Sequence, residues 1–350
     1  MSAPSVGPAT LAFVGDFMLE RRPDGEAIDA VRELLAGADA AIANVDTVLS
    51  GLGTPVPKWA NLHAPRAAAM DLAAMGVTLV TMANNHAMDF RAAGMLDTCR
   101  AYDEAGVRHA GAGENLAAAL APVRLPVAGM DVAVFSVACT LPPESAAGPD
   151  SPGIAPLRVR YAFQVDESLM PEQPGTVPEV RTWVDEGDLA RVRQAIDAVR
   201  PEVDAVVVVV HWGVPAPWRA PAHPVLQDYQ QPLGRALIEA GADAVIGNHA
   251  HELHGIELYH DRPIAYCLGN FYIDTIAKYP WMGRASVVLR LVLQAEGPPQ
   301  VEIVPELLDE DGVPRRDPAA TAIALLHEPS GGFGVTFPPT GTAYIARRRS

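Results

Sequence analysis

A chain of 350 residues, of which 49% are hydrophobic and 19% charged, is long enough to bury a large core and has the composition of an ordinary globular protein. Its formal net charge of -16 argues against nucleic acid as a partner, because phosphate binding needs clustered Lys and Arg. Three cysteines, Cys99, Cys139 and Cys267, make a poor disulfide framework, and buried thiols are expected instead.

Short apolar runs alternate with longer helical segments along most of the chain. The predicted order is strand 11–15, helix 25–35, strand 40–44, helix 67–75, strand 77–82, helix 92–105, edge strand 107–110, strand 131–138, helix 189–199, strand 205–210, helix 224–240 and strand 243–247. The run of valines in 205–210 predicts a central strand. Strands 264–268, 286–293 and 301–307 then follow without intervening helices, which indicates a mixed α/β chain with a layered sheet core.

Residues 141–186 break this alternation, being rich in Pro, Gly, Asp and Glu, with a short apolar patch at 159–165. Structureless loops of that length are uncommon unless they are functional or mobile, so we expect an insertion that borders the active site. A floppy excursion without a role is the other interpretation. Neither an internal repeat nor a convincing linker is visible, so residues 1–350 are expected to form a single domain.

The amino-terminal residues 1–10 lack a charged segment followed by an apolar one, and no run approaches the roughly 20 apolar residues of a membrane helix. The chain is therefore expected to be cytoplasmic, with no membrane partner.

Five polar clusters each follow a predicted strand: Gly15-Asp16, Asn44-Val45-Asp46, Ala83-Asn84-Asn85-His86-Ala87-Met88-Asp89, His211-Trp212-Gly213 and Gly247-Asn248-His249-Ala250-His251. Open α/β sheets gather ligands outside the carboxyl ends of their strands, so one shared site explains the clusters better than five accidents. Imidazole and carboxylate groups suit Zn, Mn or Fe, and a bridging carboxylate can hold two ions roughly 3.5–4 Å apart. If residues 249–251 are extended, both histidines project the same way.

From about residue 11 to residue 274 the chain resembles the bacterial CapA, or poly-γ-glutamate biosynthesis, proteins of the calcineurin-like metallophosphoesterase superfamily. The resemblance rests on Phe13-Val-Gly-Asp-Phe-Met18, Ala43-Asn-Val-Asp46, Ala83-Asn-Asn-His-Ala-Met-Asp89, Val210-His-Trp-Gly213, Gly241-Ala-Asp-Ala-Val-Ile-Gly-Asn-His-Ala-His251 and Tyr266-Cys-Leu-Gly-Asn-Phe271. It implies an α/β fold of the metallophosphatase type, a four-layer αββα sandwich with two mixed β-sheets, and a centre of two divalent metal ions, Mn, Zn or Fe.

The same resemblance implies roles for single residues. Asp16 and His251 would hold the first ion, Asn85, His211 and His249 the second, and Asp46 would bridge them. His86 would act as general acid while a metal-bound hydroxide attacks. Asp89 would either orient His86 or be an ordinary polar surface residue.

Four positions depart from the family pattern. Met18 replaces the His of the wider superfamily, as is usual in the CapA branch, which implies a weakly held or exchangeable first ion. Asp46 replaces the Glu usual in that branch, and Ala250 replaces the Pro between the two histidines. Arg91 follows Asp89-Phe90 where the family has Gly, so a different turn and an approach of Arg91 to the site are expected.

The expected substrate is a small or peptide-like anion, with Lys58, Asn61, Arg91 and Asn270 as candidate binding residues. Lys58 stands out because the chain has only one other lysine, and a lysine suits an anionic group. An ordinary surface lysine is the other interpretation. The predicted function is a metal-dependent hydrolase of an amide or γ-glutamyl bond, or of a phosphoester. Alternatives are an amide-forming acyl transferase on the same centre and a non-catalytic assembly component of a biosynthetic system.

Overall fold

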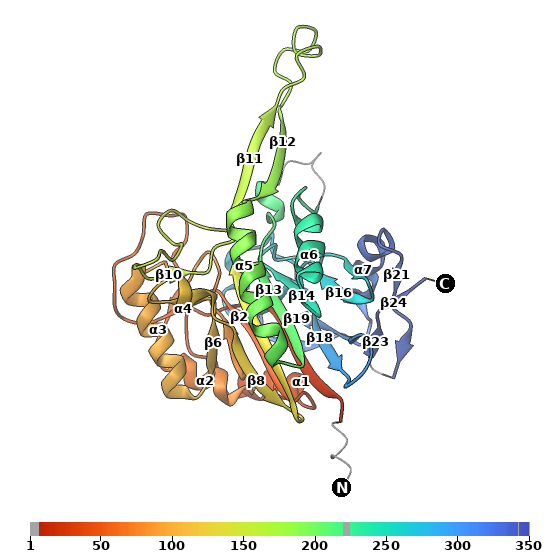
Figure 1. Cartoon of the computed structure of the whole chain (residues 1–350). Coiled ribbons are helices and arrows are strands. Elements are labelled where there is room, and N and C mark those ends of the chain that lie inside the picture. Colours follow the sequence, from red (N-terminus) through yellow and green to blue (C-terminus); the bar gives the residue numbers. More distant parts are fainter. Residues whose placement is uncertain (1–6, 220–224, 342, 350) are drawn as a thin grey trace.

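Two mixed β-sheets form the centre of the computed structural model, which describes residues 7–219, 225–341 and 343–349 (Figure 1). The larger sheet runs from edge to edge through β22 (Pro339–Thr340), β23 (Ala343–Ile345), β19 (Gln300–Leu308), β18 (Ala285–Leu293), β1 (Ala9–Met18), β2 (Ala40–Val45), β5 (Leu79–Thr81) and β6 (Arg108–Ala110). β17 (Asn270–Ile273) pairs with β1, and β20 (Pro314–Arg316) pairs with β19. β1, β2, β5 and β6 are parallel to one another, whereas β18 and β19 run antiparallel to their neighbours.

The smaller sheet runs through β15 (Ile256–Tyr259), β16 (Arg262–Ala265), β14 (Ala244–Asn248), β13 (Ala205–His211), β9 (Met130–Ala138) and β8 (Val123–Val127). β13 lies between β14 and β9 and is parallel to both. All of its side chains are buried, as the run of valines predicted for a central strand.

A shared hydrophobic core joins the two sheets. Leu11, Phe13 and Ile42 of the larger sheet contact the same cluster as Val207 and Ile246 of the smaller one. The alternate side chains of these strands face the other way and pack with the helices, as the two-residue period of a strand requires. Since both faces of each sheet are covered, the strands appear in the sequence as continuous apolar runs.

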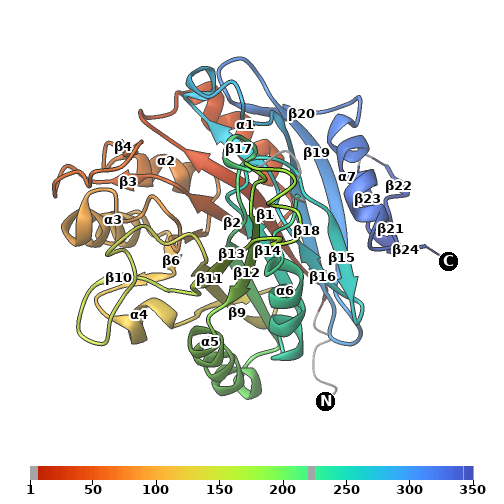
Figure 2. The ribbon, with the colours of Figure 1, turned by 90° about the horizontal axis from the view of Figure 1, so that it is seen from above.

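Helices lie outside both sheets (Figure 2). α1 (Gly25–Leu35) and α2 (Ala68–Ala74) lie beyond the larger sheet with α3 (Arg91–Ala105), and α5 (Glu186–Val199) and α6 (Gln230–Glu239) lie beyond the smaller one. Asp24 and Asp185 cap α1 and α5 by accepting a hydrogen bond from a main-chain N–H three residues on. The predicted helix 224–240 is shorter, and residue 224 lies outside the described residues.

The remaining elements are short. They are β3 (Val48–Leu49), β4 (His63–Ala64), β7 (Ala112–Gly113), α4 (Leu116–Leu120), α7 (Thr321–Gly331), β21 (Val335–Thr336), β24 (Arg347–Arg348) and three 3₁₀ turns at Arg200–Glu202, Ala216–Trp218 and Ile276–Lys278. Within the described ranges, no helix has both the length and the apolar character needed to cross a bilayer.

Residues 141–186 contain regular structure that the sequence did not predict. β10 (Gly153–Ile154) pairs with β7, and β11 (Val159–Gln164) and β12 (Glu179–Val184) form an antiparallel hairpin. The hairpin projects away from the two sheets, so only the start of the segment, at Pro142, reaches the pocket described below (Figure 1).

Candidate metal centre

The carboxyl ends of strands from both sheets meet at one place. Asp16 lies within β1, Asp46 directly follows β2, His211 ends β13, and His249 directly follows β14. The main-chain N–H of His249 donates to Oδ2 of Asp16 at 3.1 Å, which ties the end of the smaller sheet to the larger one. The junction leaves no room for a side chain beside Asp16 in β1: a Cβ on Gly15 would lie 2.2 Å from the carbonyl oxygen of Gly269.

Asp16 and Asp46 form a pair of fully buried carboxylates. The side-chain amide of Asn44 lies between them, and its Nδ2 donates to Oδ1 of Asp16 at 2.7 Å and to Oδ1 of Asp46 at 3.0 Å. Burial raises the pKa of Asp16, and burial together with the neighbouring charge of Asp16 raises the pKa of Asp46 well above its ordinary value. Because both carboxylates are buried away from water, their negative charge must be compensated by a cation or by a bound proton.

Three histidines lie against this pair. The His211 and His249 rings are 4.6 Å apart between centroids, and the His249 and His251 rings are 5.9 Å apart. Burial holds the pKa of both His211 and His249 well below the ordinary value, so these rings are neutral and each has a nitrogen that can accept. Nε2 of His211 lies 2.8 Å from Oδ1 of Asn85 and 3.8 Å from Oδ1 of Asp46.

The backbone of the two histidines after β14 differs from the extended geometry considered from the sequence. Residues 249–251 are not extended: His249 has φ +99° and His251 has φ +57°, both in the left-handed region that non-glycine residues rarely occupy. Such backbone conformations persist only where the surroundings hold them, and they are concentrated at functional sites. The condition considered from the sequence, an extended segment, is therefore not met, but His251 still lies beside Asp16 and the His249 ring beside that of His211.

Asn270 holds His251 from beneath. Its Nδ2 donates to the carbonyl oxygens of His251 and Gly283, at 3.1 and 2.8 Å, so its Oδ1 is the acceptor for Nδ1–H of His251 at 2.8 Å. Nδ1 of His251 also lies 3.4 Å from Oδ2 of Asp16. Asn270 is fully buried and its amide is committed at both ends, so the prediction that it binds substrate is wrong; it orients a histidine.

The donor set fits a divalent cation. Ligand atoms of Asp16, Asp46 and His211 all lie within 4.8 Å of one another. Oδ2 of Asp46, Nδ1 of His211 and Nδ1 of His249 are buried without a hydrogen-bond partner among the described residues. The 2.8 Å between Asn85 and His211 is close to the roughly 3 Å that separates adjacent ligands around an ion with bonds of about 2.1 Å. A buried group of carboxylates and neutral imidazoles of this kind could hold a metal ion.

His86, Asp89 and Lys58 form a connected group at the edge of this cluster. Nδ1 of His86 lies 2.8 Å from Oδ2 of Asp89, which also accepts from the main-chain N–H of Leu62. The Lys58 ammonium forms an ion pair with Oδ1 of Asp89, donates to the carbonyl oxygen of Asn85 at 2.7 Å and lies 3.2 Å from Nδ1 of His86. Asp89 is buried (1% exposed) and orients His86, which excludes the surface interpretation.

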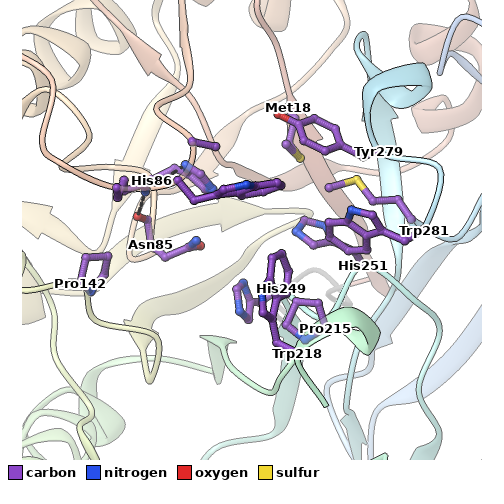
Figure 3. A pocket seen from close by; sticks show the side chains of 14 residues that line it. Met18, Asn85, His86, Pro142, Pro215, Trp218, His249, His251, Tyr279 and Trp281 are labelled. Atoms are coloured by element: carbon purple, nitrogen blue, oxygen red, sulfur yellow. Dashed lines mark hydrogen bonds between the residues drawn. The ribbon is translucent and has the colours of Figure 1, made fainter. Parts of the chain in front are cut away.

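A pocket of about 300 Å³ opens over the cluster (Figure 3). His249, His251, Asn85 and His86 line its inner end. Its remaining wall is formed by Met18, Lys58, Trp59, Ala60, Pro142, Pro215, Trp218, Tyr279, Trp281 and Met282. Met18 presents a thioether to the pocket.

Two predicted substrate-binding residues do not line this pocket. The side chain of Asn61 turns back to the carbonyl oxygen of Val56. Arg91 has φ +61°, in the left-handed region that favours glycine, and its half-exposed guanidinium lies 3.7 Å from Glu144. The predicted approach of Arg91 to the site is not seen in this structure, where its guanidinium lies beside Glu144 and does not line the pocket.

Sequence reasoning gave Trp59, in the loop after the second strand, as a weak candidate for substrate binding, but assigned no role to Asn44 or to the other three aromatic residues of the pocket. Asn44 was visible within the Asn44-Val45-Asp46 cluster, where an amide two residues before a buried carboxylate could have been interpreted as its partner. Trp218, Tyr279 and Trp281 lie in loops, and no polar cluster or sequence motif beside them indicated a binding site.

The chain belongs to the bacterial capsule synthesis protein PGA_cap family, whose sequence pattern matches residues 10–275. It is 32% identical over 311 residues to the uncharacterized protein y4sH of Sinorhizobium fredii, covering 76% of this chain and 66% of the relative. It is 29% identical to the capsule biosynthesis protein CapA of Bacillus anthracis, over 69% of this chain and 50% of that protein, and 28% identical to the PGA biosynthesis protein CapA of Bacillus subtilis, over 84% and 70%. The chain thus spans between half and about two thirds of the length of most of these relatives.

Among solved structures, a hypothetical protein from Thermus thermophilus superposes with a TM-score of 0.42 at 18% identity, over 87% of this chain and 96% of that one. That likeness is too low to support a conclusion about the site.

Proposed function

We propose that the chain is a metal-dependent hydrolase that cleaves an amide bond of a peptide-like substrate. The observation that carries this proposal is the buried Asp16, Asp46 and His211 group, in which Oδ2 of Asp46 has no hydrogen-bond partner among the described residues. It lies beside His249 and His251, which line a pocket that also contains His86. The proposal includes a metallophosphatase-like αββα arrangement and two divalent ions in that centre.

The proposed ligands follow from the contacts. Asp16 and His251 are neighbours and would hold one ion, Asn85, His211 and His249 surround a second position, and Asp46 lies between the two groups. Bound there, the ions would supply Lewis-acid activation of the scissile carbonyl and of water. The neutral His211 and His249 rings need not lose a proton on binding, which favours occupancy at neutral pH.

His86 is the residue that can move a proton. Its Nδ1–H is directed to Asp89, which leaves Nε2 free to exchange a proton in the pocket. Burial lowers the pKa of His86, so the ring begins the reaction neutral and can accept a proton in the first step. A proton taken up at Nε2 can then be passed to the departing amine nitrogen, which a scissile amide requires.

An amide is favoured over a phosphoester by the charges around the pocket. Lys58 is the one Lys or Arg among the described residues of the wall, and it is already paired with Asp89. Apart from the proposed ions themselves, the wall therefore offers no unpaired side-chain cation for the remaining charge of a phosphoester, whereas a neutral amide needs none. The names of the Bacillus relatives refer to capsule and PGA biosynthesis, which agrees with amide chemistry on a peptide-like polymer.

The test is metal analysis of the whole chain followed by turnover measurements. Protein reconstituted with Mn²⁺, Zn²⁺ or Fe²⁺ is expected to bind more than one ion per chain and to hydrolyse N-acyl amides, and a chelator should abolish both. Less than one bound ion per chain, or turnover that survives complete metal removal, would refute the proposal.

A further inference from the structure

Four aromatic side chains form one wall of the pocket beside the centre. The rings of Trp59 and Trp218 are 5.6 Å apart at 77°, and those of Trp218 and Trp281 are 5.2 Å apart at 79°. Tyr279 lies 6.0 Å from Trp59 and 6.3 Å from Trp281. The wall reaches the centre itself, because the Trp281 ring is 5.7 Å from that of His251.

The rest of the pocket surface away from the histidines is apolar as well. Met18 and Met282 contribute flexible thioether side chains, and Pro142 and Pro215 contribute rigid apolar rings. Thioether groups pack well against aromatic rings, and prolines lose little entropy when covered. All of these surfaces suit a flat apolar group.

Charge excludes the other classes of ligand that an aromatic wall can bind. The described residues that line the pocket include no Asp or Glu, so a cationic group would find no counter-charge there. Lys58 is held by Asp89, and Arg219, next to Trp218 in the chain, is held by Glu252 at 2.6 Å. On this wall, away from the proposed ions, an anionic side chain such as that of glutamate would therefore lose its hydration without gaining a side-chain partner.

The outer two tryptophans are exposed although they are large and apolar. Trp59 is 73% exposed and Trp218 is 57% exposed, and they contact each other across the mouth of the pocket. Exposed apolar patches beside a polar site commonly mark the place where a ligand is covered. The size of the pocket agrees, since a cavity of roughly 150 Å³ already holds benzene, whereas this one has about 300 Å³.

We propose that this pocket binds a neutral aromatic side chain next to the amide bond that reacts, so that the substrate presents an aromatic residue there and not a glutamate. This inference rests on the proposed function only in placing the reacting bond at the histidine end. The ring would lie between Trp59, Trp218 and Trp281, with the amide carbonyl towards His251 and His249.

The test compares three probes that differ in one side chain: N-acetyl-phenylalaninamide, N-acetyl-alaninamide and N-acetyl-glutamic acid α-amide. Their binding to the whole metal-reconstituted chain is measured by isothermal titration calorimetry. The phenylalanine probe is expected to bind at least about tenfold more tightly than the other two, and W59A and W218A are each expected to weaken it by about tenfold. W183A is the matched control, because Trp183 is also half exposed (48%) but lies on β12, away from the pocket.

Because Trp59 and Trp218 are exposed, their replacement is not expected to unfold the chain, and circular dichroism of each variant checks this. Tighter binding of the glutamate probe, no detectable binding of the phenylalanine probe, or equal effects of W59A and W183A would each overturn the inference. Because the readout is binding, these outcomes are separate from those of the proposed function: aromatic binding without metal-dependent turnover would refute only the hydrolase, and turnover without aromatic selectivity would refute only the pocket assignment.

Discussion

The ammonium of Lys58 lies 3.2 Å from Nδ1 of His86 and is paired with the carboxylate that holds that ring, Asp89. Lys58 is thus engaged with the proton-transfer group and not with a ligand. Its side chain is 20% exposed and anchors residues 56–62 over Asn85, through a bond to the carbonyl oxygen of Asn85. We infer that Lys58 is a positioning residue for His86.

Replacing Lys58 by methionine should therefore lower kcat and leave KM nearly unchanged. The variant K58M keeps the length of the side chain but releases Asp89 and the ring of His86, and we expect kcat to fall by about 10–100-fold. Steady-state kinetics on a hydrolysed amide measure this split. K278M is the control, because Lys278 is the other lysine of the chain and pairs with Glu20 on the surface. A raised KM with unchanged kcat would indicate instead that Lys58 binds substrate, as the sequence predicted.

Replacing His86 by alanine should separate catalysis from metal binding. His86 contacts Asp89 and Lys58, whereas Asp16, Asp46 and His211 make up the buried metal-binding group, so H86A is expected to keep its metal content. Turnover should fall by about 10²–10⁴-fold, the usual contribution of a positioned proton donor or acceptor. Metal analysis and kinetics on the same preparation are the measurement. If H86A retains full turnover, proton transfer by this ring is not part of the reaction.

Neutralising Asp46 should affect the metal-free and metal-bound proteins in opposite directions. Burial and the charge of Asp16 raise the pKa of Asp46, so the metal-free protein carries an uncompensated cost there. D46N keeps an acceptor for Asn44, and we expect it to stabilise the metal-free protein by about 1–3 kcal/mol while weakening metal binding by at least tenfold. Chemical denaturation with and without metal gives both quantities.

D71N is the matched control for that experiment. Asp71 is also buried, but its two oxygens accept from Arg22 at 2.6 and 2.7 Å, so neutralising it removes a satisfied ion pair. It should destabilise the protein whether or not metal is present. Parallel behaviour of D46N and D71N would mean that the Asp16 and Asp46 pair is not built around a cation.

The elements that the sequence predicted well are those whose buried positions follow the period of the element itself, along one face of a helix or throughout a central strand. The predicted helix 25–35 and strand 205–210 agree with α1 and β13 to within one residue. Asp16, Asp46, His211 and His249 could be placed at one site because parallel strands bring their carboxyl ends to one edge. At these positions the local residue pattern and the tertiary packing favour the same structure.

The predictions failed where long-range contacts decide the geometry. The left-handed conformations of His249 and His251 depend on contacts with Asp16 and Asn270, far away in the chain, and no local residue pattern reports them. The aromatic wall joins Trp59 to Trp218 and Trp281, which approach only after both sheets have formed. The β11–β12 hairpin was missed because its strands are largely exposed, so the apolar patch at 159–165 buries little surface and did not indicate a strand pair.

Glu306 gives the fold a dependence on pH that is separate from the proposed centre. It lies on β19, fully buried, with both carboxylate oxygens lacking a hydrogen-bond partner among the described residues and with Arg316 no nearer than 3.8 Å. Burial raises the pKa of Glu306 from its ordinary value of 4.5 to about 8. Below pH 4.5 the residue is protonated in both the folded and the unfolded chain, so its ionisation adds no cost to folding there.

Between pH 4.5 and about 8 the unfolded chain releases this proton while the folded chain retains it, so the free energy of unfolding falls as the pH rises. The glutamine in E306Q cannot ionise, so the free energy of unfolding of this variant should not fall in this way as the pH rises. We expect E306Q and the wild type to differ little near the lower pH and the variant to be more stable by about 2–4 kcal/mol near the upper one. Urea unfolding of metal-free protein across that range measures the difference, with E302Q, a half-exposed glutamate on the same strand, as the control. A gain that is the same at every pH would show that packing, and not ionisation of Glu306, is responsible.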